Sequence, residues 1–299
     1  MKISDGQLQF GGIGSVPEDR YAFDPLGREL GFESAGPLAV MTRDQLHPPF
    51  VDDEEVWKSG QRWYEGAIRH TRRAAELCRL TVGARVVDIG SGLGGPARTL
   101  VDDFGVEVVA VNLVESQLVT MIDINQREQA WQAHIFPVLA DANERLPISR
   151  ADCVWSMNML YHLFDHDAFI SNARQVLSPG SILMVDDWMF TDRSDSDARN
   201  VMAHHFGSNN LVTLRGLLGL FETHDFQVID VIDCGAIART HMTAHFRSTF
   251  DRDFRPALVE LDATFGVTTA DDFGAAIDAT IELYSDERLT YLQIAAQAI

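Results

Sequence analysis

The chain contains 299 residues, 46% of them hydrophobic, and 44 acidic against 24 basic side chains give it a formal net charge of −20. This size and composition are those of one large or two small globular domains, and an acidic surface that repels phosphate backbones excludes nucleic acid as an expected partner. Three cysteines without CxxC spacing predict neither a disulfide framework nor a zinc site, which indicates a reducing, cytoplasmic compartment. The chain has no uninterrupted apolar run of about 18 residues, so no membrane helix is expected.

The chain begins with a segment, residues 1–80, that we expect to be irregular at first and helical over 51–80. It is interpreted as an N-terminal helical cap. Residues 81–235 alternate short apolar runs with helical patterns, which predicts a parallel sheet covered on both faces. Residues 236–286 are expected to form a second, inserted helical cap, and 287–299 the final strand of the sheet.

Within this plan the elements follow one another regularly. Strands are expected over 84–90, 106–112, 134–140, 151–158, 181–188, 227–233 and 288–299. Helices are expected over 95–105, 115–130, 166–180 and 211–226. The stretch "RSDSDAR", residues 193–199, is expected to be a solvated loop after the fifth of the strands in the main alternation.

The stretch "VVDIGSGLGG" follows the first of these strands and opens the next helix, as a nucleotide-binding loop does. It fits both the dinucleotide fingerprint G-x-G-x-x-G and a loop for S-adenosylmethionine (SAM). Asp88 lies two residues before Gly90, where a carboxylate suits a cationic ligand and repels a pyrophosphate. Pro96 has no N–H to donate to an anion. The second strand ends at Asn112 instead of an acidic residue, although Glu115 is close, so the pattern favours SAM over NAD.

These residues resemble the first motif of the class I SAM-dependent methyltransferases, in their small-molecule branch. The terpenoid C-methyltransferases, such as those acting on geranyl diphosphate and in teleocidin synthesis, and more distantly the cyclopropane fatty acid synthases, are similar. The resemblance implies a seven-stranded sheet of order 3-2-1-4-5-7-6 with the last strand antiparallel, flanked by helical caps. It also implies that 81–235 binds SAM through a set of residues in four segments. They are Asp88, Gly90, Ser91, Gly92, Gly94, Asn112, Leu113, Gln117, Asp141, Ala142, Asn143 and Met157.

The parts of that set carry separate implied roles. "VNLVESQ" resembles a segment whose Asn112, Leu113 and Gln117 would hold the ribose, although Val114 stands where the family pattern has a capping serine. "ADANERLP" resembles the adenine-binding turn, in which Asp141 or Asn143 would accept from the adenine amino group and Ala142 would donate its N–H. "ARQVLSPGSILMVDD" resembles the segment that closes the fold, with Ser181 in place of a glycine.

The acceptor is expected beyond the carboxyl ends of the strands, near "WSMNMLYHLF". Here Tyr161 and His162 stand where cyclopropane synthases have Glu and His, and Asn158 stands about where geranyl diphosphate C-methyltransferases have an acidic residue that removes a proton. Aromatic residues of the caps and strand ends indicate a hydrophobic small-molecule acceptor. The predicted acceptor-binding residues are Tyr21, Phe23, Trp57, Trp188 and Phe206. The first 30 residues are expected to lie over this site, in the same chain or in a neighbouring subunit of a homo-oligomer.

Three activities stay open at this stage. The first is C-methylation of a prenyl or terpenoid alkene, with the resulting cation free to drive a cyclisation. The second is O- or N-methylation of a similar metabolite with His162 as base. The third is a SAM-fold binding protein or pericyclase. No metal site is predicted, although His241 and His245 are four residues apart. The arginines that could hold a diphosphate form no tight cluster, which favours a neutral prenylated acceptor. They are Arg193, Arg199, Arg215, Arg239 and Arg247.

Overall fold

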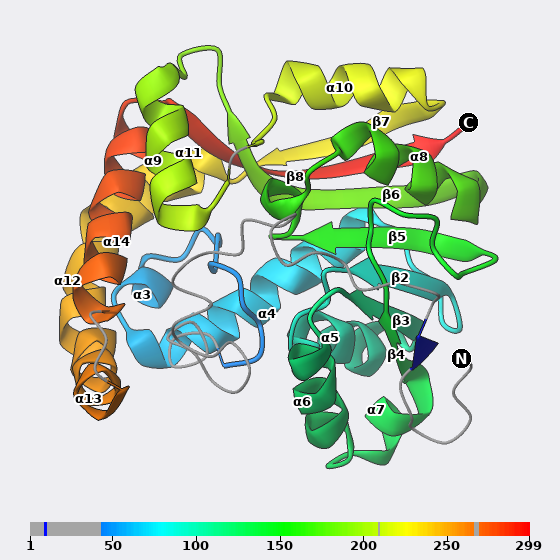
Figure 1. Cartoon of the computed structure of the whole chain (residues 1–299), viewed down its shortest axis with the longest axis horizontal. Helices are drawn as coiled ribbons and strands as arrows, with labels where there is room; N and C mark the ends of the chain where they lie inside the picture. Colours follow the sequence, from blue (N-terminus) through cyan, green and yellow to red (C-terminus); the bar gives the residue numbers. More distant parts are fainter. Residues whose placement is uncertain (1–8, 11–42, 209, 266–268) are drawn as a thin grey trace.

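The computed structural model describes residues 9–10, 43–208, 210–265 and 269–299. Their strands form one sheet in the order β1-β4-β3-β2-β5-β6-β8-β7, in which β8 runs antiparallel to both of its neighbours (Figure 1). The strands are β1 Gln9–Phe10, β2 Arg85–Ile89, β3 Glu107–Asn112, β4 Ile135–Leu139, β5 Ala151–Met157, β6 Leu177–Phe190, β7 Phe226–Asp233 and β8 Leu289–Ala298. Apart from β1, this is the expected seven-stranded sheet of order 3-2-1-4-5-7-6.

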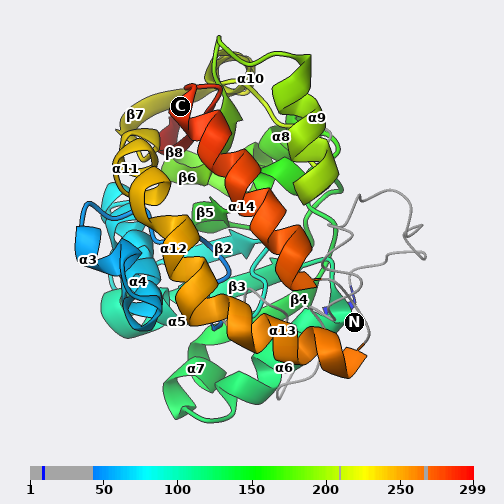
Figure 2. The ribbon, with the colours of Figure 1, turned by 90° about the vertical axis from the view of Figure 1, so that its left-hand side faces the viewer.

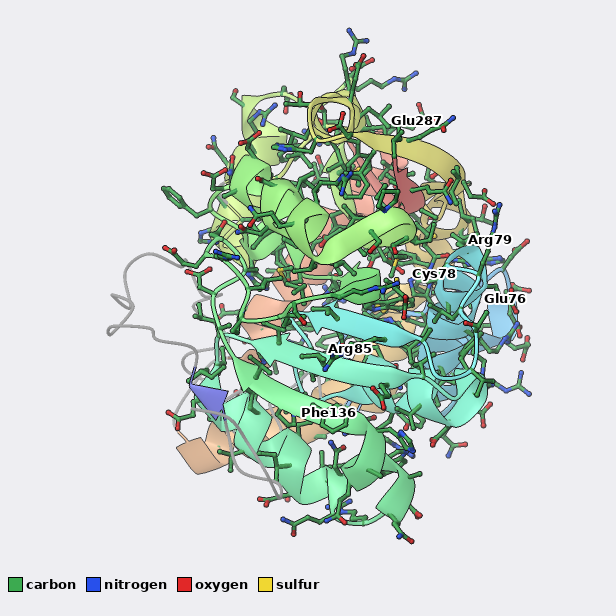
Figure 3. The ribbon with its side chains drawn as sticks, turned by 90° about the vertical axis from the view of Figure 1, so that its right-hand side faces the viewer. Glu76, Cys78, Arg79, Arg85, Phe136 and Glu287 are labelled. Atoms are coloured by element: carbon green, nitrogen blue, oxygen red, sulfur yellow. The ribbon has the colours of Figure 1, made fainter. Side chains whose placement is uncertain are left out.

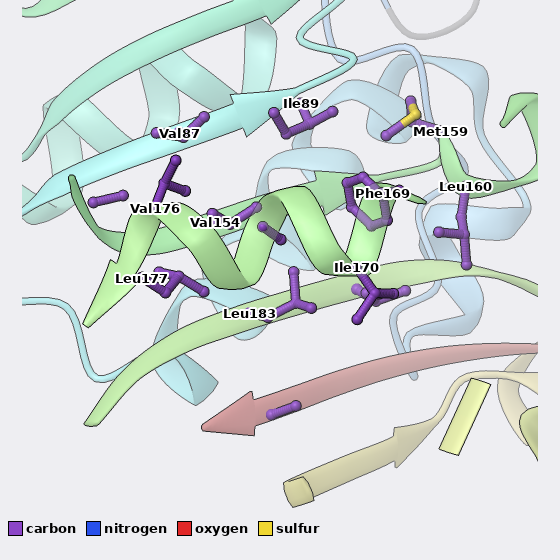
Figure 4. Close-up of a cluster of buried hydrophobic side chains, with 14 of the residues drawn as sticks. Val87, Ile89, Val154, Met159, Leu160, Phe169, Ile170, Val176, Leu177 and Leu183 are labelled. Atoms are coloured by element: carbon purple, nitrogen blue, oxygen red, sulfur yellow. The ribbon is translucent and has the colours of Figure 1, made fainter. Parts of the chain in front are cut away.

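Helices cover both faces of the sheet, which is why its central strands are apolar along nearly their whole length. In β3, "EVVAVN", every residue after the first is buried. One face is covered by α4 Gly60–Leu77, α5 Gly95–Phe104 and α6 Glu115–Asn125. The other is covered by α8 His166–Val176 and α10 Leu214–Thr223. Figure 4 shows Phe169 and Ile170 of α8 against Val87, Val154 and Leu183 of the strands.

The cap helices gather at the end of the sheet where the parallel strands finish (Figures 1 and 2). The first cap contains α3 Glu54–Trp57 and the start of α4. The second contains α11 Gly235–Ile237, the π-helix η3 Ala238–Phe246, α12 Arg247–Thr249, the π-helix η4 Phe250–Phe254, α13 Arg255–Phe265 and α14 Thr269–Ser285. Figure 3 shows the opposite side of the molecule, where Arg85 begins β2 and Arg79 follows α4.

The two caps are joined to each other by hydrogen bonds and ring contacts. The Thr249 hydroxyl donates to the Trp57 carbonyl at 2.7 Å, and the Gly60 N–H donates to Asp253 Oδ2 at 2.8 Å. The Trp63 and Phe246 rings stack with their centroids 4.6 Å apart. Residues almost 200 positions apart in the sequence therefore form one layer over the end of the sheet where the parallel strands finish, which we call the ligand edge.

Three details differ from the sequence-based expectations. The predicted loop "RSDSDAR" is half helical, because Asp195 caps α9 Ser196–Phe206 by accepting from the Ala198 N–H at 2.9 Å. The expected helix over 115–130 is divided into α6 and α7 Gln129–His134. Within residues 1–30, Gln9 and Phe10 form β1, a short strand that the sequence analysis did not predict, and pair with β4 at the edge of the sheet. The rest of that segment lies outside the described residues, so its expected place over the acceptor site stays a prediction.

Candidate functional site

The glycine loop between β2 and α5 brings backbone, not side chains, to the ligand edge. Gly90 has a φ of +75°, and a Cβ added there would lie 2.1 Å from Met159 Cγ. A side chain at position 90 would therefore collide with the segment after β5, so the turn that leaves β2 requires glycine here. The loop is held from behind because the Gly90 and Ser91 N–H groups both donate to the Val111 carbonyl of β3. The predicted loop geometry is present in the structure.

A segment of the expected N-terminal cap, for which the sequence analysis gave no contact with the cofactor loop, lies across this loop. We call residues 43–51 the strap. The Asp44 carbonyl accepts from the Gly95 N–H at 3.1 Å, and a Cβ added to Gly95 would lie 2.3 Å from that oxygen. Asp44 also forms an ion pair with the buried Arg98 at 2.7 Å, while Gln45 donates to Thr99 at 3.3 Å. The strap is thus fixed to the first turns of α5, and only the tertiary structure reveals it.

Two polar groups beside the loop have no partner in the described part of the chain. Asp88 Oδ2 and Ser91 Oγ are both buried without a hydrogen bond. Burial raises the pKa of Asp88 to about 7. Buried polar atoms without partners are rare, and a ligand is one source of the missing bonds. A carboxylate and a hydroxyl at this place fit the ammonium and carboxylate of an amino-acid moiety, so the site matches the methionine end of SAM.

The predicted ribose residues lie together at the end of β3. Asn112 Nδ2 donates to Gln117 Oε1 at 2.7 Å, and Asn112 Oδ1 accepts from the Leu113 N–H at 2.9 Å. The Val114 N–H donates to the same oxygen at 3.4 Å. Val114 is the N-cap residue of α6 and its side chain accepts no hydrogen bond, so the Asn112 side chain stabilises this turn instead. The ribose role of these residues stays a prediction.

The predicted adenine turn, which follows β4, is held by hydrogen bonds within the turn and to α8 and the residue before it. Asp141 Oδ1 accepts from the Asn143 N–H at 2.8 Å, and Asn143 Oδ1 accepts from the Asp165 N–H at 3.1 Å. Asn172 of α8 donates to the Ala142 carbonyl at 3.2 Å. These bonds position the turn at the same edge as the glycine loop. Its contact with adenine is likewise a prediction.

The predicted catalytic residues lie on the segment that follows β5. We call Asn158, Tyr161 and His162, together with the neighbouring Trp188 ring, the acceptor wall. Asn158 has a φ of +52°, its Nδ2 donates to the Leu46 carbonyl of the strap at 3.2 Å, and its Oδ1 is buried without a partner among the described residues. Burial lowers the pKa of His162 to about 4. The Tyr161 ring lies 3.8 Å from the His162 ring and 4.9 Å from the Trp188 ring, centroid to centroid. Met157 is buried at the end of β5, within 3.8 Å of the Thr71 hydroxyl.

The predicted acceptor-binding aromatics fall into two neighbouring groups. Trp188 and Phe206 lie 4.9 Å apart beside Tyr161. Trp57 is fully buried and lies 5.9 Å from Phe50, a strap residue that the sequence analysis did not select. Phe50 in turn lies 4.4 Å from Tyr291 of β8. Five of these six rings belong to one buried cluster of the two caps and the strand ends, and the partly buried Phe206 packs against it. Tyr21 and Phe23 lie outside the described residues.

Sequence reasoning missed the acidic pair at the end of β6. The Asp187 oxygens accept from the Leu160 N–H at 2.5 Å and the Trp188 N–H at 2.7 Å, and burial raises the pKa of Asp187 to about 8. Asp186 points to the opposite face and pairs with His70 of α4 at 2.8 Å. The signal was present in the sequence, because two adjacent carboxylates inside an apolar strand are rarely buried without a function or a partner.

The two histidines of "HMTAH" pair with carboxylates of the first cap. His241 lies 2.8 Å from Asp52 and His245 lies 3.0 Å from Glu54, so each of them joins the second cap to the first. No group of three or more metal-binding side chains is present within the described ranges. In the same part of the chain, none of the helices is both long and apolar enough to span a lipid bilayer.

The sheet order and the glycine loop together define the class I methyltransferase architecture. Residues 61–231 match the family model described as a methyltransferase domain, which is more than half of the chain. The chain therefore belongs to this family and carries a SAM-dependent methyltransferase domain, as the resemblance implied.

Individual relatives differ in the atom that they methylate. The sterol 24-C-methyltransferase of Aspergillus fumigatus is 28% identical over 138 residues, which are 46% of this chain and 37% of that protein. The fold is similar to that of phosphoethanolamine N-methyltransferase 2 of Haemonchus contortus, with a TM-score of 0.76 and 17% identity over 96% of this chain and 61% of that one. It is also similar to geranyl diphosphate C-methyltransferase of Streptomyces coelicolor, with a TM-score of 0.63 and 19% identity over 80% and 82% of the chains. The chain spans less than half the length of the sterol enzyme.

Proposed function

We propose that this protein transfers a methyl group from SAM to an alkene carbon of a hydrophobic small molecule, such as one that carries a prenyl or terpenoid chain. SAM supplies an electrophilic methyl group on a sulfonium. In this proposal Asp88 and Ser91 bind its amino-acid end, Asn112 and Gln117 its ribose, and Asp141 to Asn143 its adenine. The strap holds the loop in place through Asp44 and Arg98 and keeps water from the reacting atoms.

One observation carries the choice of carbon as the methylated atom. The acceptor wall combines aromatic rings with a histidine whose pKa, lowered to about 4 by burial, makes it a poor base for a hydroxyl or an ammonium. An alkene needs no deprotonation before it attacks a methyl group. The cation that it becomes is stabilised by aromatic faces and needs only a weak base to lose a proton. The sterol C-methyltransferase relative supports this chemistry.

A neutral acceptor fits better than a free diphosphate. Four of the five arginines that the sequence offered for a diphosphate have carboxylate partners, and they are spread over the caps and strand ends. The pairs are Arg193–Glu287, Arg215–Asp192, Arg239–Asp233 and Arg247–Asp278. The guanidinium of Arg199 lies over the Phe190 ring, 4.7 Å from its centroid. Each of these charges has a structural contact already.

Heteroatom methylation is the second candidate, because the fold is also that of an N-methyltransferase and His162 lies in the acceptor wall. The experiment that separates the two uses SAM carrying a ¹³C-labelled methyl group. The full chain is incubated with prenylated aromatic compounds, isoprenoid alcohols and hydroxylated or amino analogues of the same size. A labelled methyl group bonded to carbon in the NMR spectrum of the product supports the proposal, whereas a label on oxygen or nitrogen replaces it with the second candidate.

A further inference from the structure

A buried polar network lies behind the aromatic acceptor wall. Asp186 of β6 and His70 of α4 are fully buried, and His70 Nε2 lies 2.8 Å from Asp186 Oδ2. Gln293 of β8 donates from Nε2 to the same oxygen at 2.7 Å. Burying a carboxylate costs several kcal/mol unless hydrogen bonds replace its water, so these two contacts explain how one oxygen is tolerated.

Arg73 of α4 extends this network. Its Nη2 lies 3.2 Å from His70 Nδ1, which also faces the Phe50 carbonyl at 3.4 Å, and its Nε donates to Gln293 Oε1 at 2.7 Å. Because a carboxylate only accepts hydrogen bonds, His70 Nε2 carries the proton that points at Asp186. Burial alone would raise the pKa of Asp186, but the interaction with His70 and the hydrogen bond from Gln293 outweigh it and hold the pKa below its usual value. Asp186 is therefore a carboxylate with a fixed orientation.

The second oxygen of this carboxylate is unexplained by the network. Asp186 Oδ1 is buried and makes no hydrogen bond of normal geometry to the residues that the structure describes. The Tyr291 hydroxyl, which helps to lower the pKa of Asp186, donates instead to the Asp186 backbone carbonyl at 3.3 Å. A purely structural ion pair explains why Oδ2 is buried. It does not explain Oδ1, whose burial without a hydrogen bond destabilises the folded state. A proton acceptor requires an ionised oxygen of this kind, which is fixed in position and makes no other hydrogen bond.

The position of Asp186 joins it to the acceptor wall. Its backbone carbonyl accepts from the N–H of Asn158, one of the predicted catalytic residues, at 2.7 Å. The Phe50 and Tyr291 rings of the aromatic cluster lie 5.9 and 5.8 Å from the His70 ring. The Asp186 carboxylate thus lies on the strand next to the predicted catalytic segment.

We propose that Oδ1 of Asp186 accepts the proton that the substrate loses after methylation, with His70 and Gln293 as positioning residues. The inference rests on the proposed function. Addition of the methyl group to one alkene carbon leaves the other cationic. A C–H bond next to that centre then breaks, its electron pair forms the new C=C bond, and the proton moves to Oδ1. The cation is thereby neutralised, and the protonated Asp186 returns its proton to solvent when the product leaves.

Two ammonium probes test this without knowledge of the natural acceptor. N,N-dimethyldecylamine is protonated at neutral pH and presents an N–H to an acceptor, as the cationic intermediate presents a C–H. Trimethyldecylammonium has the same charge and no such N–H. Titration calorimetry with the full chain and S-adenosylhomocysteine, below the micelle concentration, is expected to show at least tenfold tighter binding of the tertiary probe to the wild type.

Asp186→Asn is expected to abolish this preference while S-adenosylhomocysteine affinity stays within threefold. Asp152→Asn is the matched control, because Asp152 is exposed near the opposite end of β5 and accepts only from the Arg85 N–H. Equal binding of the two probes to the wild type overturns the inference, even if Asp186→Asn fails to fold. A preference that persists in a folded Asp186→Asn protein also overturns it.

Failure of this inference is distinguishable from failure of the proposed function. If ¹³C-labelled products carry the methyl group on nitrogen or oxygen, C-methylation is wrong whatever the probes show. If products carry it on carbon and the probes bind equally, only the role of Asp186 is wrong. With a carbon-methylating acceptor in hand, Asp186→Asn is expected to lower turnover at least tenfold and to divert product toward hydride-shifted or cyclised forms.

Discussion

The proposed cofactor site and the proposed acceptor site, which we call the cofactor half and the acceptor half, lie at the same edge of the sheet and are built in different ways. The cofactor half is a local structure, in which Asp88, the glycine loop and the start of α5 follow one another in the sequence. The acceptor half brings together Phe50, Trp188 and Tyr291 from the strap, β6 and β8. The first half therefore depends on backbone conformation, and the second on the packing of side chains from distant segments. Variants that damage one half and spare the other test this division.

The largest effect is expected from Gly90→Val. The new side chain would meet Met159 within 2.1 Å, and the φ of +75° is strained for any residue with a Cβ. S-adenosylhomocysteine affinity measured by calorimetry should fall at least a hundredfold. Gly219→Ala in α10, with no atom within 4 Å of the added Cβ, is the control and should leave affinity unchanged. Unaltered affinity in Gly90→Val would show that the loop is not the cofactor site.

Trp188→Ala addresses the acceptor half. Removal of this buried ring beside Tyr161 and Phe206 should cost about 3–5 kcal/mol of unfolding free energy, measured in urea, through the cavity that it leaves. Acceptor turnover should be lost, whereas S-adenosylhomocysteine affinity should change less than threefold. Trp131→Ala is the matched control, because Trp131 is a half-buried residue of the otherwise exposed α7, and it should keep turnover. A large loss of cofactor affinity in Trp188→Ala would contradict the division between the halves.

Asp44→Asn weakens the strap where it holds the glycine loop. The buried Arg98 keeps Asn125 and the Leu93 carbonyl as partners but loses its carboxylate, which should cost about 1.5–3 kcal/mol. Stopped-flow measurement should show S-adenosylhomocysteine leaving several times faster. Asp103→Asn, which breaks the exposed pair with Arg72, should cost about 1 kcal/mol at most and leave the release rate unchanged. Equal release rates in both variants would exclude the strap from cofactor retention.

The pH dependence of cofactor binding should report Asp88. Its pKa of about 7 in the free protein means that the carboxylate must be formed before it can bind an ammonium, so affinity should rise about tenfold from pH 6 to pH 8. The stability of the free protein runs the other way. Because the folded state holds this proton more tightly than the unfolded state, stability should fall as pH rises from about 4 to about 7. Asp88→Asn should flatten the affinity profile; a profile that stays steep would assign it to another group.

The smallest effect is expected from His162→Ala on C-methylation. With its pKa lowered to about 4, His162 is neutral throughout the assay range, and its loss should lower turnover only about two- to fivefold through altered packing against Tyr161. The loss should not be rescued at high pH. His134→Ala at the exposed end of α7 is the control. Rescue of His162→Ala by raised pH would favour heteroatom methylation with His162 as the base.

The accuracy of the sequence-based predictions follows the same division. The strand and helix pattern predicted a parallel sheet covered on both faces, because apolar runs that alternate with helices leave few other arrangements. The order of its strands was implied by the resemblance to the class I methyltransferases. It misjudged 193–199, where the capping bond from Asp195 outweighs the polar composition, and it missed the break between α6 and α7. Tyr161, Trp188 and Phe206 are brought together as predicted, whereas Phe50 and Tyr291 were not selected, because no local pattern relates them.

The sequence by itself determined the parallel sheet, the glycine loop and the class of cofactor, since each of these depends on neighbouring residues and backbone geometry. Only the tertiary structure brings together the residues of the proposed acceptor site. It placed the strap on the glycine loop through Asp44 and Arg98, and it joined His70, Asp186 and Gln293 across more than 200 positions. The physical reason is that a buried charge is tolerated only where distant segments supply its partners, and these partners leave no periodic signal in the chain.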